Sequence, residues 1–310
     1  MTNDPYKEFE AIKQFCKKSF KSEELWPSYY ERRYQEFLTF YDLLPKKQYV
    51  KILELGCGIG YYSAFLSKIS TEVTATDLEI IDSSTHSPGL QITRDFLSAL
   101  NIKNVTVIHA SAEELPFEDN TFDLVFSSHV IEHVPDPNKA VLEINRVLKQ
   151  GGINFCVVPT TTDRFYAFFT FYIYLFQRLT AKIYRKVLPI KKTDTDVTAV
   201  PSSKVGVNIR YYLKHFPFPP PHGVHPSYLN EVRNWTLKKW KKIVTNNNKI
   251  KLVSLYGLQL NPLLPTLGNI FPNLGVKLFS FTRKTENKLG KNHFVKYFGI
   301  STLIITEKTE

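Results

Sequence analysis

Short apolar runs alternate with longer amphipathic segments over the first half of the chain. Segments between the runs, such as 91–100 and 138–149, place apolar residues at helical spacing. The second of these begins beside Pro137 and ends at Gly151-Gly152, as helices often do. The runs themselves have the length and β-branched content of buried strands, and they cover 50–55, 72–77, 105–109, 122–127 and 153–158. This alternation predicts a parallel sheet covered by helices on both faces.

The flanking regions extend this pattern. Residues 6–44 are predicted to be helical, and a helix over 228–245 is followed by strands over 251–256 and 299–306. We expect an α/β, Rossmann-like doubly wound sheet of seven strands, with the last strand antiparallel. The predicted parts are a helical cap (1–45), a core (46–158), a basic and aromatic insertion (159–230) and a C-terminal part (231–310) with its own insertion (259–295).

A glycine-rich turn follows the first apolar run. Gly56, Gly58 and Gly60 alternate with other residues, and Tyr61 stands where the last glycine of a dinucleotide-binding Gly-x-Gly-x-x-Gly motif belongs. Glu54 lies inside the strand just before this turn. A carboxylate there repels a pyrophosphate and suits a cationic ligand, which disfavours a nicotinamide-dependent dehydrogenase.

Asp77 ends the second strand, 17 residues after Gly60. A carboxylate at this place can accept both hydroxyls of a ribose. The alternative is a helix cap. The register of Glu54 and Asp77 favours the ribose interpretation.

The segment SAEELPF (111–117) follows the third strand. Together with the residues at 54–60 and Asp77, it resembles the class I S-adenosylmethionine-dependent methyltransferases, in the small-molecule branch that includes the ubiquinone and menaquinone methyltransferases. The resemblance covers about residues 48–158. It implies an enzyme with S-adenosyl-L-methionine as cofactor.

The resemblance also implies which residues contact the cofactor. Many family members have an aspartate where this chain has Ser111, so the contacts to the adenine amino group are expected from Ser111 or from the neighbouring backbone. The expected contacts are Glu54 near the ammonium group, Gly56, Cys57, Gly58 and Gly60 along the methionine part, Asp77 at the ribose, Leu78 on one adenine face, Ser111, Ala112 and Glu113 at the adenine edge, and Ser128 after the fourth strand.

A histidine- and glutamate-containing segment follows the fourth strand. His129, Glu132 and His133 fall at positions i, i+3 and i+4, so in a helical turn they share a face. His129 and His133 are the candidate catalytic residues, with His129 the better base. It stands where the quinone enzymes have a glutamate. We expect no metal, although Glu132 and His133 could be ligands. The competing interpretation, that Glu132 and His133 only pack the loop, is slightly favoured.

Charge is distributed unevenly. Residues 1–159 contain 16 Lys/Arg and 22 Asp/Glu (−6), 160–250 contain 16 and 4 (+12), and 251–310 contain 8 and 3 (+5). Such asymmetry points to an anionic partner for the basic part. The three cysteines, odd in number and widely spaced, indicate a reducing compartment.

Two apolar stretches bear on the acceptor. Residues 165–176 are dense in aromatics and precede Arg178, Lys182, Arg185 and Lys186, which suits either the interface of a membrane or a lid helix packed on the core. A second stretch covers 263–281. Together they favour a lipid-like or lipid-linked acceptor. His222 and His225 have no acidic residue close in sequence and are expected in a turn.

These observations predict a methyltransferase acting by in-line transfer on a small or lipid-linked acceptor, with oxygen as the favoured acceptor atom. The alternatives are a catalytically inactive protein that binds cofactor or lipid, and an RNA-directed methyltransferase. Nucleic acid is disfavoured because no RNA-binding module is recognisable in the sequence. The expected location is the cytoplasm, with contact to the inner face of a membrane through the basic region 160–310 as an open alternative. The oligomeric state is left open.

Overall fold

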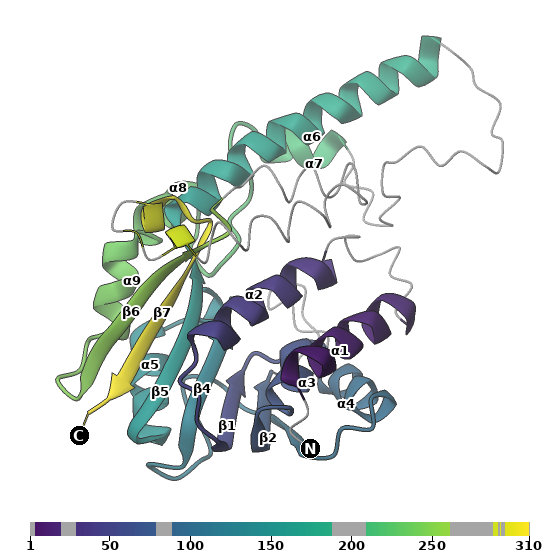
Figure 1. Ribbon diagram of the computed structural model, residues 1–310. Helices are drawn as coiled ribbons and strands as arrows, with labels where there is room; N and C mark the ends of the chain where they lie inside the picture. Colours follow the sequence, from purple (N-terminus) through teal and green to yellow (C-terminus); the bar gives the residue numbers. More distant parts are fainter. Residues whose placement is uncertain are drawn as a thin grey trace.

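The computed structural model describes residues 4–19, 29–78, 89–187, 209–260, 288–290, 292 and 295–309 (Figure 1). Its centre is one seven-stranded sheet in the order β3-β2-β1-β4-β5-β7-β6. The strands are β1 (Tyr49–Leu55), β2 (Ser70–Asp77), β3 (Val105–His109), β4 (Phe122–Ser128), β5 (Leu148–Pro159), β6 (Ile250–Leu258) and β7 (Ser301–Lys308). The predicted strands are all present, within a few residues of their expected ends.

Strand directions confirm the predicted fold class. Strands β1 to β5 pair in parallel, and β7 is antiparallel to both β5 and β6. In β1, residues 52–55 are all buried, because helices cover both faces of a parallel sheet. The apolar side chains of Ile52, Leu53 and Leu55 are what made this strand recognisable in the sequence.

The helices are α1 (Pro5–Ser19), α2 (Tyr29–Leu43), α3 (Tyr61–Leu66), α4 (Leu90–Ala99), α5 (Pro137–Val147), α6 (Thr161–Val187), α7 (Ile209–Lys214), α8 (Tyr228–Asn234) and α9 (Leu237–Val244). Two 3₁₀ turns cover Ile131–His133 and Val295–Phe298. The single helix expected over 228–245 is wrong. The first helix ends at Asn234, and a new helix begins after Thr236 because the Thr236 hydroxyl caps the N–H of Lys239.

Aromatic packing joins the N-terminal helices to one face of the sheet. Phe9 and Phe37 are fully buried, and Phe37 stacks on Phe65 of α3 at 4.6 Å between ring centres. Phe40 contacts Phe155 of β5, also at 4.6 Å. These helices therefore share one hydrophobic core with the sheet, and α1 and α2 lie together over this face (Figure 1).

A second core lies on the opposite face, under α5 and α9. Trp240 of α9 is buried there, and its indole N–H donates to the carbonyl of Pro159 at 2.8 Å. Trp240 therefore also fixes the end of β5, where α6 begins.

No helix in the described ranges is long and apolar enough to cross a bilayer. The apolar stretch expected over 263–281 lies outside the described residues.

Candidate functional site

The predicted site residues gather at one edge of the sheet. Strands β1 to β5 are parallel, so their carboxyl ends meet at this edge, and the order of strands reverses between β1 and β4. Ligands of open α/β sheets bind outside the strand ends at such a point. The glycine turn follows β1, Asp77 ends β2, Ser111 follows β3 and His129 follows β4.

The glycine turn uses backbone conformations that favour glycine. Gly56, Gly58 and Gly60 have φ of 67°, 53° and 83°. A Cβ atom on Gly56 would lie 2.3 Å from Cγ2 of Val130, so there is no room for a side chain. A Cβ atom on Gly58 would meet nothing within 4 Å. Gly56 therefore allows the loops after β1 and β4 to approach each other, whereas Gly58 borders open space.

Asp77 holds this turn in place. One carboxylate oxygen accepts the N–H of Gly58 at 2.8 Å, and the other accepts the N–H of Leu78 at 2.7 Å. A carboxylate has about four acceptor positions, so these contacts leave further positions for a ligand's hydroxyl groups. Asp77 thus connects the end of β2 to the turn after β1.

Glu54 lies beneath the turn with only 1% of its surface exposed. Burial raises the pKa of its carboxyl group to about 8. A hydrogen bond from Ser63 opposes that rise, and the charge of Asp77 adds to it. Two carboxyl groups this close to each other favour a positively charged neighbour. The surroundings of Glu54 and Asp77 therefore suit a cationic ligand.

The loop after β3 is fastened to the loop after β4. The hydroxyl of Ser111 accepts the N–H of Glu113 at 3.2 Å, and the carboxylate of Glu113 accepts the N–H of Asp136 at 3.0 Å. Ser111, Ala112 and Glu113 are all half-buried. Glu113 therefore positions neighbouring backbone, a role that its place in the sequence did not indicate.

Cys57 lies within the turn and is nearly buried. Its N–H donates to the carbonyl of Thr76 at 2.9 Å, and its sulfur lies 3.9 Å from the hydroxyl of Thr93 in α4. Burial raises the pKa of the Cys57 thiol well above its usual range. The thiol is therefore protonated, and its contacts are those of a packing residue.

His129 is held between two elements. It has a left-handed backbone (φ 57°), and its N–H donates to the carbonyl of Val157 at 2.9 Å. Its Nδ1 lies 3.3 Å from Oε1 of Glu132, and its Nε2 lies 3.3 Å from the hydroxyl of Ser301 in β7. This arrangement, an imidazole oriented by a buried carboxylate, is typical of a general base.

Glu132 is completely buried next to His129: its side chain is 0% exposed. Burial alone would raise the pKa of its carboxyl group, but His129 and His133 outweigh burial and lower it. The ring of His133 lies 5.0 Å from that of His222, which comes from the segment between α7 and α8. Glu132, His133 and His222 each offer a ligand atom, and these atoms lie within 4.8 Å of one another, so the three residues could hold a metal ion.

No acidic residue is close to His222 in sequence, but the fold brings Glu132 next to it. Val224 donates its N–H to the carbonyl of Glu132 at 3.2 Å, so the segment around His222 lies directly on the 3₁₀ turn. A Cβ atom on Gly223 would lie 2.5 Å from the carbonyl oxygen of Glu132. The approach is therefore close enough to require a glycine at this position.

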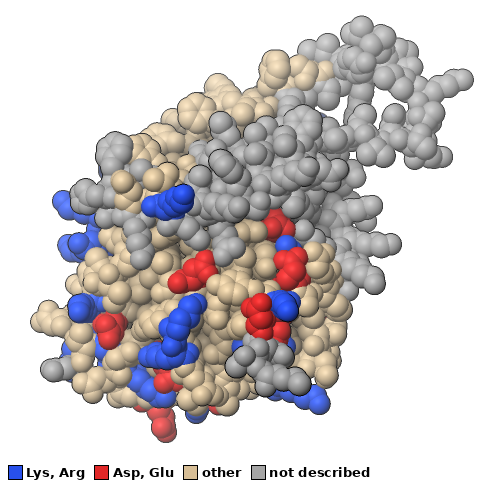
Figure 2. Space-filling model, in the orientation of Figure 1, with Lys and Arg blue, Asp and Glu red and all other residues tan. Residues whose placement is uncertain are grey.

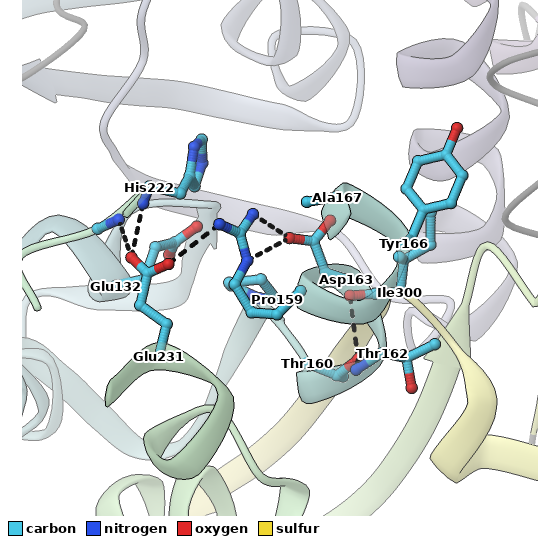
Figure 3. Close-up of polar contacts among 12 residues, drawn as sticks. Glu132, Pro159, Thr160, Thr162, Asp163, Tyr166, Ala167, His222, Glu231 and Ile300 are labelled. Carbon is cyan, nitrogen blue, oxygen red and sulfur yellow. Dashed lines mark hydrogen bonds and ion pairs between the residues drawn. The ribbon is translucent and has the colours of Figure 1, made fainter. Parts of the chain in front are cut away.

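A buried ion pair fixes this segment (Figure 3). Oε1 of Glu231 accepts the N–H groups of His222 and Gly223, both at 2.6 Å, and Oε2 lies 3.0 Å from the guanidinium of Arg164. Arg164 also contacts Asp163 at 2.5 Å and lies over the ring of Trp235. Glu231 on α8 therefore connects the start of α6 to the segment that carries His222.

Helix α2 contributes a residue to the site, Glu36, that the sequence did not predict. The hydroxyl of Ser128 donates to Glu36 at 2.8 Å, and Glu36 also pairs with Arg33 at 3.1 Å. Glu36 is buried at the end of β4, 92 residues away in the chain. Its only sequence signal is a charged residue on the apolar face of a predicted helix, which is too weak to assign a site.

The features of this edge fit S-adenosylmethionine. The cofactor carries an ammonium and a sulfonium group together with a ribose. The buried carboxyl of Glu54 suits the positive charge, Asp77 retains acceptor positions for hydroxyl groups, and the open space beside Gly58 leaves room for a ligand against the backbone. When bound, S-adenosylmethionine supplies an activated methyl group.

Comparison with known proteins agrees with this fit. Residues 53–156 match the model of the family described as a methyltransferase domain. The matched methyltransferase segment holds the glycine turn, Asp77, the loop after β3 and the His129–His133 segment.

Curated relatives and one solved structure extend the comparison. Demethylmenaquinone methyltransferases of Staphylococcus aureus strains MRSA252 and JH9 are 34% and 35% identical to this chain over 142 and 141 residues. These alignments cover 43% of this chain and 55% of each relative, so the chain spans about half the length of the relatives it matches. A chain from the complex of the Haloferax volcanii methyltransferase activator Trm112 with a methyltransferase has the same fold, with a TM-score of 0.50 at 15% identity, covering 99% of this chain and 97% of that one.

Proposed function

We propose that this protein is an S-adenosylmethionine-dependent methyltransferase whose acceptor is a small or lipid-linked molecule. The observation that carries the proposal is the contact between Asp77 and Gly58, made within a segment that matches the methyltransferase domain family. It joins a carboxylate at the end of β2 to the glycine turn after β1, which is the place where a cofactor lies in open α/β sheets.

In this proposal, the cofactor lies against the backbone of the glycine turn. Asp77 accepts hydrogen bonds from the ribose, and Glu54 balances positive charge from below. Leu78 covers the adenine, with Ser111, Ala112 and Glu113 at its edge. The side chain of Cys57 is nearly buried, so only its backbone is expected to contribute.

The acceptor is proposed from the names of the relatives. They are demethylmenaquinone methyltransferases, which suggests a quinone-like ring on a lipid tail as the acceptor class here. The aromatic surface of α6, which begins directly after the site edge at Thr161, is consistent with an apolar acceptor. We propose oxygen as the methylated atom, because His129 lies at this edge and can remove the proton of a hydroxyl group.

His129 is proposed to remove the proton of the acceptor. With Nδ1–H directed to Glu132, the lone pair on Nε2 points to Ser301 and can accept a proton from a hydroxyl group placed there. Glu132 then stabilises the imidazolium with its buried charge. His133 packs beside His222 and is proposed to shape the site. No step of this proposal uses a metal: Oε1 of Glu132 lies beside Nδ1 of His129, at 3.3 Å, and its charge acts there on the imidazole.

Calorimetric titration with S-adenosylmethionine tests the cofactor site. Asp77→Ala is expected to weaken binding at least about tenfold, since it removes a charged hydrogen-bond acceptor. Asp123→Ala is the matched control. Asp123 also accepts two backbone N–H groups, those of Val50 and Lys51, at 2.9 and 2.8 Å, but it lies at the opposite edge of the sheet. Binding that is unchanged in Asp77→Ala would contradict the assignment.

A cofactor analogue that lacks the ribose 2′-hydroxyl separates ribose binding from support of the turn. If Asp77 binds the ribose, Asp77→Ala weakens binding of this analogue less than binding of the natural cofactor. The analogue already lacks the hydroxyl group that Asp77 would contact, so the substitution removes nothing further there. An equal loss with both ligands would assign Asp77 to the turn alone. Cofactor binding without methyl transfer to demethylmenaquinone or to lipid extracts would favour the inactive alternative.

A further inference from the structure

Helix α6 has apolar side chains on two opposite faces. The inner face packs on the protein: Phe171 contacts Tyr212 of α7 at 5.0 Å between ring centres, and Phe168 lies 6.4 Å from Tyr228 of α8. Arg164, on the same face, is held by its buried pair with Glu231. This face has the properties expected of a lid helix packed on the core.

The outer face of α6 is exposed and equally apolar. Its side chains follow one another at spacings of four, four, three and three residues, so they form one continuous row along the helix. Phe169 and Phe176 are the most exposed, at 65% and 67%. We name this row the outer stripe; it consists of Phe165, Phe169, Ile173, Phe176 and Leu179.

The outer stripe is unusual for a protein surface. Single exposed apolar residues are common, but a row of five large ones with no charged residue among them marks an interaction surface. At about 1.5 Å per residue, the stripe is about 21 Å long. Figure 1 shows α6 leading away from the sheet, and Figure 2 shows uncharged side chains along this upper edge.

A second exposed apolar group adjoins the stripe. Phe216 is exposed and lies 6.3 Å from Tyr172 of α6, whose hydroxyl donates to the carbonyl of Pro217 at 2.7 Å. Leu213 of α7 is exposed as well. The apolar surface therefore extends from α6 to the segment after α7.

Basic residues adjoin this apolar surface. Arg210 and Lys214 lie exposed on α7, and the sequence of α6 after Phe176 contains four cations and no acidic residue. Residues 160–250 as a whole contain 16 Lys/Arg and 4 Asp/Glu. Aromatic side chains flanked by cations match the interface of an anionic bilayer, where rings enter the headgroup region and cations contact lipid phosphates.

We propose that the outer stripe of α6 docks on the surface of an anionic membrane. The inner face stays packed on α7 and α8, so the helix lies along the bilayer with one face inserted. The two interpretations of residues 165–176, membrane contact and lid helix, then apply to opposite faces of one helix. The stripe begins one turn after the site edge, so docking would bring the site close to lipid-linked acceptors. This inference adds a partner to the proposed function, and docking itself does not require methyl transfer.

Vesicle flotation tests the proposal. The full chain is mixed with vesicles of phosphatidylcholine alone or with added phosphatidylglycerol. We expect it to float with the anionic vesicles and to be released as salt is raised. The double variant Phe169→Glu/Phe176→Glu is expected to lose flotation, with partitioning reduced about tenfold or more for each ring withdrawn from the interface.

The matched control is Leu142→Glu, which places the same charge on an exposed apolar position of α5, 52% exposed and outside the stripe. It should float like the unmodified protein. Flotation of the double variant at the unmodified level, or no flotation of the unmodified protein with either vesicle, overturns the proposal. A dimer in light scattering that dissociates in the double variant also overturns it, since the stripe would then be covered by a second copy.

Titration of the same variants with S-adenosylmethionine tests the methyltransferase proposal separately from the membrane-docking proposal. S-adenosylmethionine binding that persists in a protein that does not float removes the membrane partner and leaves the methyltransferase proposal intact. A protein that floats but does not bind S-adenosylmethionine keeps the membrane partner and contradicts the methyltransferase proposal. The double variant must keep the melting temperature of the unmodified protein, and if it does not, the single variant Phe176→Glu, the most exposed position of the stripe, takes its place.

Discussion

Nδ1 of His129 lies 3.3 Å from the carboxylate of Glu132, a side chain that is completely buried. An imidazole held in this way keeps its other nitrogen available as a base. We therefore expect His129→Asn to lower kcat about 100-fold or more while leaving the affinity for S-adenosylmethionine within about twofold. Asparagine is chosen because it tolerates the left-handed backbone at this position.

The control for this prediction is His225→Asn, which changes a histidine that lies between α7 and α8 and has no assigned role. Its kcat should match that of the unmodified protein. If His129→Asn transfers methyl groups at the normal rate, His129 is not the base, and the reaction proceeds without proton removal at this position.

Glu54 gives a prediction on pH and stability. Its carboxyl pKa is raised by burial from 4.5 to about 8, so between these values the folded protein keeps a proton that the unfolded chain loses. The contribution of this group to the free energy of unfolding therefore falls as pH rises through that window, by about 1.4 kcal/mol for each pKa unit. Glu54→Gln removes the effect, so its melting temperature should rise relative to that of the unmodified protein between about pH 5 and about pH 9.

Glu143→Gln is the matched control for Glu54→Gln. Arg146 lowers the pKa of Glu143, so this carboxylate is ionised in both the folded and the unfolded chain over the tested range. Its substitution should change the melting temperature by the same amount at both pH values. A constant difference for Glu54→Gln as well would show that Glu54 ionises at its ordinary pKa.

Alanine substitutions at Gly58 and Gly151 separate the effect of backbone strain from the effect of ligand contact on cofactor binding. Both have positive φ, 53° and 71°, and in both a Cβ atom would meet nothing within 4 Å. An alanine at either position should cost about 1–2 kcal/mol of backbone strain. Only Gly58 borders the proposed cofactor site, so Gly58→Ala alone should weaken S-adenosylmethionine binding, by about tenfold or more. Equal affinities for the two variants in calorimetry would place the cofactor elsewhere.

The pair of Arg164 and Glu231 is expected to be a major source of local stability. Both side chains are buried, and Glu231 also accepts two backbone N–H groups at 2.6 Å. Glu231→Gln removes the charge that faces Arg164 and leaves Asp163 as its acidic partner, so it should lower the free energy of unfolding by about 1–3 kcal/mol in urea titrations. The double variant Glu231→Gln/Arg164→Met should lose less than the sum of the two single losses. Additive losses would show that the two residues act independently.

The cofactor side could be predicted from the sequence because its signals are local. A buried parallel strand is a continuous apolar run, and the turn after it requires glycine at fixed positions, so Gly56 to Gly60 and Asp77 follow from short segments. The sheet and its antiparallel last strand follow from the alternation of such segments. The error at 228–245 has a local cause too: apolar spacing continues through Trp235, and only the hydroxyl of Thr236 marks the break.

The acceptor side could not be predicted because its contacts join distant parts of the chain. Glu36 contacts Ser128 across 92 residues, and the carboxylates near His222 are those of Glu132 and Glu231, both from other elements. No spacing rule connects such positions. The two faces of α6 also looked alike in sequence, since both are aromatic, and only the packing of Phe171 against Tyr212 distinguishes the inner face from the outer one.

The aromatic contacts of the N-terminal helices have a practical consequence for anyone who wishes to exchange parts between related enzymes. Residues 53–156 match the family model, but Phe155 packs against Phe40, and Tyr61 donates its hydroxyl to the carbonyl of Tyr30, both partners lying before that segment. A fragment cut at the limits of the match would expose these aromatic rings to water and leave the hydroxyl of Ser128 without Glu36. Chimeras of this protein should therefore take α1, α2 and the matched segment from the same parent protein.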